Sequence, residues 1–250
     1  MTERTLLSLT GADRLDFLQG LVTNDVTGGD IVYTALLTPQ GKYLADFFVV
    51  PQADRYVIDV DSDLAPGLAQ RLSMYRLRAD VQIETQPGAV TCGTGEMPDG
   101  ALPDPRHAAL GWRLYSDGSA PEVAPEDWTA LRVAHGIPKT GAELKDDTFI
   151  LEAGFERLNG VDFRKGCFVG QEIVARMKHK TTLRKGLAQV AIKGNAEPGP
   201  LLTQDGREAG TLTTIAGDLG LAHLRFDRAA GPMTSGKAEV TMVRNFLTDP

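Results

Sequence analysis

The sequence predicts an α+β fold that ends in a small β-barrel or sandwich, and three observations support this prediction. Helical and strand-like apolar patterns both occur in the first 185 of the 250 residues. Five short strand-like runs follow at regular spacing, which is typical of a barrel or sandwich. The composition, 42% apolar and 24% charged, indicates a globular chain with a substantial core. We therefore expect a body at 1–185, built of two interleaved subdomains, and a barrel domain at 186–250.

The first half of the chain mixes strands with two helices. Apolar runs predict strands over residues 5–9, 31–37, 43–50, 55–60, 81–83, 89–92 and 111–115. A helix over 12–21 has leucines at i, i+3 and i+6, and Thr10 and Asp13 have the spacing of an N-terminal cap. A helix over 63–76 has leucines one turn apart, so we expect one of its faces to be buried.

The second half begins with a helix and continues with strands. The helix starts near Pro125, which suits a first helical position, and ends at Gly136. Strands are predicted over residues 187–192, 200–203, 208–214, 220–225 and 238–243. The dipeptide Asp205-Gly206 is a strong hairpin signal between two of these strands.

Charge, hydropathy and cysteine content limit the class of protein. The net charge of −7 argues against a general nucleic-acid coat, so we expect no direct nucleic-acid partner. No run of 18 apolar residues occurs and the charged N-terminal segment is unlike a secretory signal, so no membrane partner is expected. The two cysteines, Cys92 and Cys167, lie far apart, and a disulfide is not expected in a reducing compartment. These features predict a soluble, cytoplasmic protein.

The chain is not expected to hold a metal stably. A structural zinc or a four-iron cluster normally takes about four ligands, mostly thiolates. This chain has two cysteines, and its four histidines are scattered without any metal-ligand spacing. Cys92 has no cationic neighbours in the sequence, so we interpret it as structural.

The strongest chemical signal surrounds Cys167. This thiol lies where a loop enters a helical pattern, and the unpaired N–H groups of a first helical turn favour a thiolate. Arg164 and Lys165 add positive charge, and flanking glycines allow backbone angles that side chains forbid. We predict that Cys167 is a reactive group whose pKa Lys165 lowers. The alternative is a buried, inert cysteine in a glycine-bearing turn.

A basic segment continues beyond the cysteine. Seven Lys or Arg, among them Arg176, lie between Arg164 and Lys185, against one acid, Glu172. On an acidic chain, such a segment predicts a surface that faces an anion, although it is also compatible with a solvated face.

The residues around Cys167 resemble a known family signature. The octet consists of Lys165, Gly166, Cys167, Phe168, Val169, Gly170, Gln171 and Glu172. It is similar to the signature of the YgfZ-type folate-binding proteins, paralogues of the glycine-cleavage T-protein (aminomethyltransferase) that assist iron–sulfur cluster assembly. Weaker matches lie at 11–20, 23–26, 37–42, 75–81 and 151–155.

The resemblance implies a fold and a cofactor. The fold would be an aminomethyltransferase-like body of mixed sheets and helices around a central cavity, closed by a C-terminal β-barrel. The cofactor would be tetrahydrofolate or a derivative. Asp46 would accept hydrogen bonds from the pterin, because a carboxylate can accept two N–H groups of an amino-pyrimidine edge. Asn24, Tyr75 and Arg78 are the other predicted folate contacts, although Asn24 could instead close a turn on its own backbone.

The resemblance also implies a function. The chain would be an accessory factor for assembly or repair of [4Fe–4S] clusters in client enzymes, including radical-type enzymes that modify tRNA. Its partners would be reduced folate and iron–sulfur client or assembly proteins. Cys167 would ligate iron transiently or accept sulfur, and Gln171 and Glu172 would cap the helix or fix the cysteine loop.

Three other functions are compatible with parts of the sequence. One is a folate-dependent aminomethyltransferase or demethylase of one-carbon metabolism, although Ala134 stands where the catalytic T-proteins have an acid. Another is a cysteine hydrolase, with His179 twelve residues beyond Cys167. RNA binding through the basic segment is the third, although interleaved aromatic residues other than Phe168 are absent there.

Overall fold

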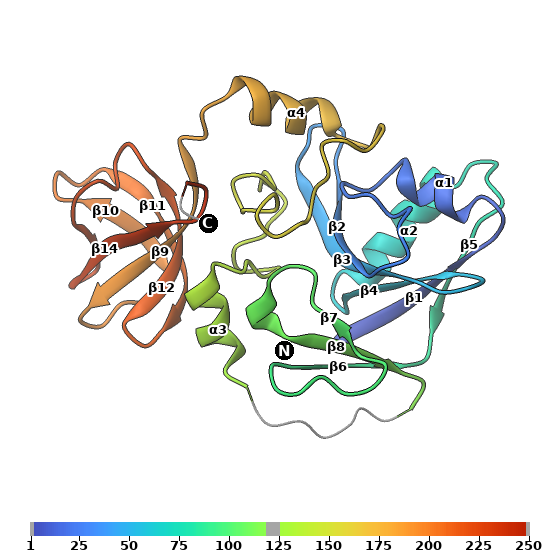
Figure 1. The fold of residues 1–250 in the computed structure, drawn as a ribbon. Helices are drawn as coiled ribbons and strands as arrows, with labels where there is room; N and C mark the ends of the chain where they lie inside the picture. Colours follow the sequence, from blue (N-terminus) through green and yellow to red (C-terminus); the bar gives the residue numbers. More distant parts are fainter. Residues whose placement is uncertain (1–2, 119–125, 249–250) are drawn as a thin grey trace. The chain divides into compact units, whose positions relative to one another are not determined.

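The computed structural model describes residues 3–118 and 126–248, which form two compact units (Figure 1). The first unit consists of Met1–Glu126 and Leu158–Ile173, and the second of Asp127–Arg157 and Val174–Pro250. The barrel strands all lie in the second unit. The division at residue 185 stays a prediction, since segments on both sides of it belong to the second unit.

A five-stranded antiparallel sheet is the centre of the first unit, with strand order β2-β3-β4-β1-β5. Its strands are β1 (Arg4–Thr10), β2 (Val32–Leu37), β3 (Tyr43–Pro51), β4 (Tyr56–Asp61) and β5 (Gln82–Gln86). All five were predicted from apolar patterning. The β2–β3 turn holds Gly41 at φ +73°, a left-handed conformation that favours glycine.

Two helices cover one face of this sheet, α1 (Arg14–Gln19) and α2 (Ala65–Tyr75) (Figure 1). Leu18 of α1 and Leu68 and Leu72 of α2 are buried in one cluster with the sheet. Helix α1 is shorter than predicted, and the predicted cap is wrong. Asp13 makes no side-chain capping bond, because its carboxylate accepts the N–H of Asp80 instead.

The other face of the sheet is more polar. Because successive residues of a strand point to opposite faces, Asp46, Phe48 and Asp59 point away from the helices. A three-stranded sheet follows in the same unit, with order β6-β8-β7. It consists of β6 (Ala89–Gly93), β7 (Leu102–Pro103) and β8 (Trp112–Ser116), with a 3-10 turn, η1, at Ala108–Leu110. The short β7 was not predicted.

The second unit contains α3 and a closed barrel. Helix α3 (Trp128–His135) ends at Gly136 as predicted, with this glycine in the left-handed conformation. Asp127, predicted to lie in the first turn, caps the helix instead. Its predicted start at Pro125 lies outside the described residues. The barrel order is β10-β11-β12-β9-β14-β13. Its strands are β9 (Lys185–Lys193), β10 (Gly199–Thr203), β11 (Glu208–Ala216), β12 (Leu219–Arg225), β13 (Met233–Ser235) and β14 (Ala238–Asn245).

Helix α4 (Gln171–Lys180) follows the cysteine loop. It begins in the first unit and ends in the second. Among the described residues, no helix has both the length and the apolar content needed to span a bilayer.

Leu77, just beyond α2, has an unusual backbone conformation. Its φ is +46° and its side chain is 88% exposed, so no burial offsets the strain of a left-handed leucine. Asn tolerates this conformation better than Leu does. We therefore expect Leu77→Asn to raise the free energy of unfolding by about 0.5–1 kcal/mol, as measured by urea denaturation.

The matched control for this prediction is Met74→Asn. Met74 is 70% exposed as well, but it lies in α2, where Asn is a poorer helix former than Met. This control should lower stability slightly. Equal changes in the free energy of unfolding for the two substitutions would show that relief of backbone strain at Leu77 does not stabilise the protein.

Candidate functional site

Cys167 is exposed and lies in the loop that leads into α4. Gln171, the first residue of α4, holds this loop with both ends of its amide. Its Oε1 accepts the backbone N–H of Phe168 at 2.9 Å, and its Nε2 lies 3.7 Å from Cys167 Sγ. The Gln171 backbone N–H donates in return to the Phe168 carbonyl. This reciprocal pattern resembles a capping box and presents the thiol to solvent beside the helix start.

Lys165 fixes the other end of the loop. Its half-buried ammonium donates to the backbone carbonyls of Gln19 (2.8 Å), Val22 and Asn24 (3.1 Å). Burial lowers the pKa of Lys165 to about 8, although the charges of nearby acids oppose this shift. Lys165 thus ties the cysteine loop to the turn after α1. Its predicted effect on the pKa of Cys167 stays a prediction.

Two glycines bring the cysteine loop against the β2–β3 turn. Gly170 has φ +84°, and a Cβ there would lie 2.6 Å from the Thr38 carbonyl oxygen. A Cβ on Gly41 would lie 2.8 Å from Cβ of Ile173. Both distances are too short for real atoms, so glycine is required at both positions. Gly166 differs, because an added Cβ would meet nothing within 4 Å.

The remaining motif residues support the loop or face solvent. Val169 packs against the core of the first unit. The Phe168 ring centroid lies 5.4 Å from Lys165 Nζ. Glu172 and Arg176 are exposed on α4, so their predicted part in the site stays a prediction.

Asp46 lies half-buried on the polar face of the sheet, between two buried tyrosines. The Tyr33 hydroxyl donates to its Oδ2 at 2.9 Å, and the Tyr43 hydroxyl donates to its Oδ1 at 2.6 Å. Burial, and next the charge of Asp46, raise the pKa of Tyr33, so this hydroxyl keeps its proton. The tyrosines therefore fix the orientation of the carboxylate.

A buried ionic network lies on the same face and was not predicted. Asp59, fully buried, pairs with Arg4 (2.6 Å) and with Arg113, and Arg113 also reaches Asp104 at 3.3 Å. Burial raises the pKa of Asp59, but the charges of Arg113 and Arg4 outweigh this effect and hold it below its usual value. Phe48 lies under Arg113, with 3.8 Å between the guanidinium carbon and the ring centroid.

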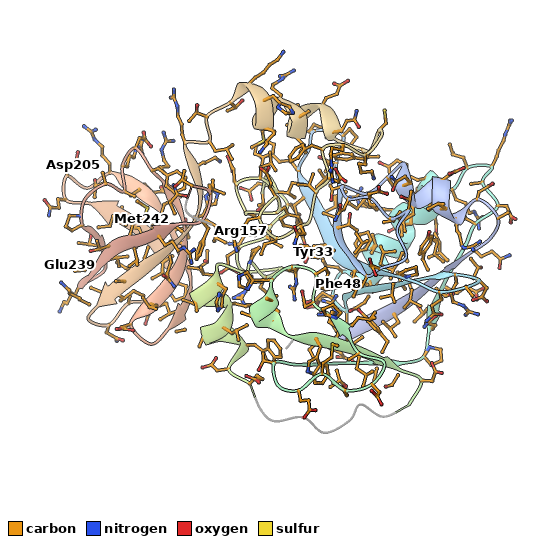
Figure 2. The ribbon with its side chains drawn as sticks, in the orientation of Figure 1. Tyr33, Phe48, Arg157, Asp205, Glu239 and Met242 are labelled. Atoms are coloured by element: carbon orange, nitrogen blue, oxygen red, sulfur yellow. The ribbon has the colours of Figure 1, made fainter. Side chains whose placement is uncertain are left out.

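This network extends to Tyr33, one of the two tyrosines beside Asp46. Arg106 forms a two-point ion pair with Asp104, and its guanidinium carbon lies 5.5 Å from the Tyr33 ring centroid. The Tyr33 ring also packs against Phe48, with 5.3 Å between their centroids, and both are marked in Figure 2. Asp46, the predicted pterin-binding acid, therefore lies next to an ionic network that sequence patterning could not detect.

The other predicted folate contacts, Asn24, Tyr75 and Arg78, stay predictions. Asn24 donates to the carbonyls of Tyr33 (2.9 Å) and Asn159 (2.6 Å), and its Oδ1 accepts the N–H of Asp25, which closes the turn. Tyr75, at the end of α2, is 36% exposed, and Arg78 beyond it is also exposed. None of the hydrogen bonds and ion pairs given above joins these three residues to Asp46 directly.

Comparisons with known proteins identify the family. A mouse protein (Mus musculus) named "Iron-sulfur cluster assembly factor IBA57, mitochondrial" is 30% identical, and the match covers 96% of this chain and 80% of that protein. The chain belongs to the IBA57 family. The human (Homo sapiens) IBA57 protein is 28% identical over 92% of this chain and 78% of its own length. The family model "CAF17, C-terminal beta-barrel domain" matches residues 184–246.

The IBA57 assignment refines the resemblance to YgfZ-type proteins, which pointed to a related group. A solved structure confirms the predicted fold class. Aminomethyltransferase T of the glycine cleavage system from Bartonella henselae superimposes with a TM-score of 0.72. The match covers 98% of this chain and 83% of that structure at 11% identity, so it shows the fold alone.

The names of these IBA57 relatives contradict one prediction. The mouse, human and Neurospora crassa proteins are all named as mitochondrial. The predicted cytoplasmic location is therefore wrong. It rested on hydropathy and cysteine content, which argue against secretion but do not distinguish one reducing compartment from another.

Proposed function

We propose that this chain assists iron–sulfur cluster assembly and that Cys167 is the group that contacts the cluster. The observation that supports this most directly is the geometry of the cysteine loop. Gln171, Lys165 and the contact between Gly41 and Gly170 hold an exposed thiol at a fixed position. A cysteine that served only to fill space would not need so many contacts to fix its loop. Membership of the IBA57 family supports the same function, since its members are named cluster assembly factors.

The cluster would be cargo that Cys167 shares with another protein. An iron–sulfur cluster is normally held by four ligands, mostly cysteine thiolates. Within residues 3–118 and 126–248, no group of three or more His, Cys, Asp or Glu side chains could hold a metal ion. A single thiolate from this chain would therefore bind iron only while a partner, either an assembly protein or a client enzyme, supplies the other ligands.

Reduced folate is the small molecule proposed for the first unit. A carboxylate can accept hydrogen bonds from the adjacent N–H groups of an amino-pyrimidine edge. Asp46 is half-buried, and the two tyrosine hydroxyls orient its carboxylate. This carboxylate therefore fits the amino-pyrimidine edge of a pterin. Bound folate would supply one-carbon or redox chemistry, whereas the protein would bind and orient it.

Folate binding predicts a thermal shift. Saturating tetrahydrofolate should raise the melting temperature, because a ligand at about 100 times its Kd adds about 2.7 kcal/mol to the free energy of unfolding. Asp46→Asn should lose most of the shift, because an amide cannot accept the same two hydrogen bonds. Differential scanning fluorimetry under anaerobic conditions measures both effects.

The matched control is Asp30→Asn, which changes an exposed acid in the loop before β2 and should leave the shift intact. A wild-type protein without any shift would rule out the folate proposal. It would not affect the cluster proposal, which is tested by rescue. Cells that lack their own IBA57-family protein should recover [4Fe–4S] enzyme activity when they express this chain.

A further inference from the structure

A pocket of about 500 Å³ lies entirely within the second unit. We call it the Arg157 pocket. Its apolar wall consists of Leu151, Met177, Leu183, Phe226, Phe246 and Leu247. This size is within the range of small-molecule sites, which combine apolar walls with a few placed polar groups.

Arg157, which is labelled in Figure 2, is the polar group that distinguishes this pocket. Its guanidinium is half-buried, with the carbon 5.0 Å from the ring centroid of Phe246. Arg244 lies on the same ring at 5.3 Å. The ring packs closely on Gly136, where an added Cβ would lie 2.5 Å from it. Phe246 therefore holds Arg157 at a defined position.

Arg157 has few partners in the described part of the chain. Its Nη2 donates to the Gly136 carbonyl at 2.7 Å. Its Nε is buried without a hydrogen-bond partner, and none of the described carboxylates forms an ion pair with it. The pocket wall also contains Lys178 and Glu156, which form an ion pair with each other. A cation in an apolar site without a counter-charge is costly unless something else compensates it.

The pKa of Arg157 is consistent with a free-energy cost of burying its charge. Burial, and next the positive charge of Arg244, lower the pKa of Arg157 to about 10. At neutral pH the guanidinium still carries its charge. An anion placed in the pocket would offset both unfavourable effects.

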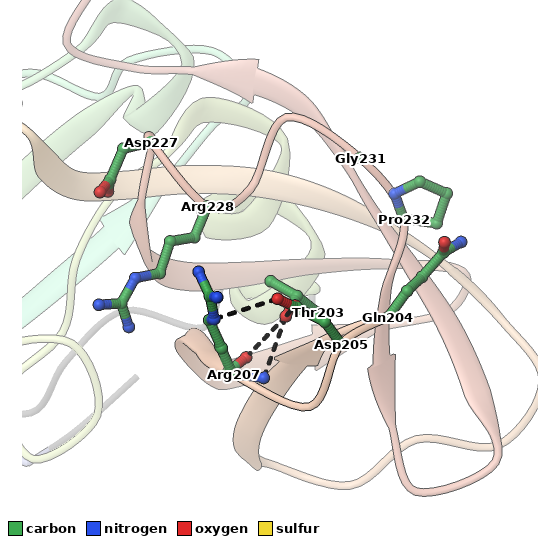
Figure 3. A pocket seen from close by; sticks show the side chains of 8 residues that line it. All are labelled: Thr203, Gln204, Asp205, Arg207, Asp227, Arg228, Gly231 and Pro232. Carbon is green, nitrogen blue, oxygen red and sulfur yellow. Dashed lines mark hydrogen bonds and ion pairs between the residues drawn. The ribbon is translucent and has the colours of Figure 1, made fainter.

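A second pocket in the same unit differs from the Arg157 pocket in the surroundings of its charged side chains. It has a volume of about 360 Å³ and lies beside the β10–β11 turn of the barrel (Figure 3). Of its two cations, Arg207 lies 3.0 Å from Asp205, and Arg228 is exposed, so that water can solvate its charge. This second pocket therefore lacks a partly buried cation without a counter-charge, the feature that distinguishes Arg157.

We propose that the Arg157 pocket binds a small monocarboxylate with a flat, apolar body, and that Arg157 binds the carboxylate. The guanidinium has N–H groups in a planar fork that matches the two oxygens of a carboxylate. The apolar walls suit the body of such a ligand, and a single uncompensated charge matches a monoanion. This site goes beyond the proposed function, because it uses neither Cys167 nor Asp46.

The test compares 1-naphthoate with its neutral isostere, 1-naphthamide, by calorimetric titration of the full chain at low salt. Wild-type protein should bind the carboxylate roughly tenfold or more tightly than the amide, since a charge-assisted contact is lost in the amide. Arg157→Met keeps an apolar side chain on Phe246 but removes the charge, and should abolish this preference. Arg157→Lys should retain part of it, because the charge remains without the fork.

Arg184→Met is the matched control. Arg184 is an exposed cation of the same unit outside the pocket wall, so its loss should leave the preference unchanged. Equal binding of carboxylate and amide by wild-type protein would overturn the proposal without relying on any variant. Unchanged preference in Arg157→Met would also overturn it and would leave Arg157 with a packing role alone.

Discussion

Cys167→Ser should reduce the rescue of [4Fe–4S] enzyme activity at least about tenfold in cells that lack their own IBA57-family protein. Serine keeps the size of the side chain and can still contact Gln171, but it cannot form a thiolate that binds iron at neutral pH. Because Cys167 is exposed, the substitution should change the free energy of unfolding by less than about 0.5 kcal/mol. Enzyme activity and protein abundance are measured in the same cells.

The chain supplies its own control in Cys92→Ala. Cys92 is buried in β6, and burial raises the pKa of its thiol, so it stays protonated. Its removal should leave rescue close to that of the wild-type chain. Full rescue by Cys167→Ser would demote the exposed thiol to a structural role, and equal losses in both variants would point to stability instead of chemistry.

Asp59→Asn should cost about 3–5 kcal/mol of unfolding free energy, the largest stability effect we expect in this chain. The substitution removes the buried charge that pairs with the guanidinium groups of Arg4 and Arg113, while Arg113 keeps its ion pair with Asp104. Chemical denaturation of the two proteins at neutral pH measures the difference. Asp54→Asn is the matched control, because Asp54 pairs with Arg55 on the exposed surface, and its loss should be barely measurable.

The stability difference between wild type and Asp59→Asn should also depend on pH. The folded-state pKa of Asp59 lies below its usual value, so the carboxylate stabilises the fold fully above its unfolded-state pKa, about 3.9. The contribution is lost as the pH falls through the lower, folded-state pKa. Wild type and variant should therefore differ by a constant amount above about pH 5 and converge in stronger acid. A gap that stays constant into strong acid would show that Asp59 is not the titrating group.

Most of the fold could be predicted from local patterns. Helix α2 was predictable because Leu68 and Leu72 repeat at one turn, and the same residues are buried in the core. Asp205-Gly206 correctly marked the turn between β10 and β11. Strand β13 was missed because three residues are too few for a pattern, and its place depends on pairing with β10 and β14.

The candidate site was predictable only in part. The motif identified Cys167 as a loop residue before a helix, because glycine and helical periodicity are local signals. The partners of Lys165 could not be predicted, because its carbonyl acceptors lie more than 140 residues earlier in the chain. The same reason applies to Asp59 and Arg113, which are 54 residues apart and meet only after two sheets have formed.

Because Gly41 and Gly170 lie close together, a change in the β2–β3 hairpin should affect the position of the Cys167 thiol. A side chain at Gly170 would displace the Thr38 carbonyl and one at Gly41 would displace the Ile173 side chain, so the hairpin tip and the cysteine loop pack in direct contact. Lengthening the hairpin by one residue would shift Cys167 without altering a single atom of the motif. A spectroscopic label at Lys42, next to Gly41, would in turn report on the arrival of a partner at the sulfur.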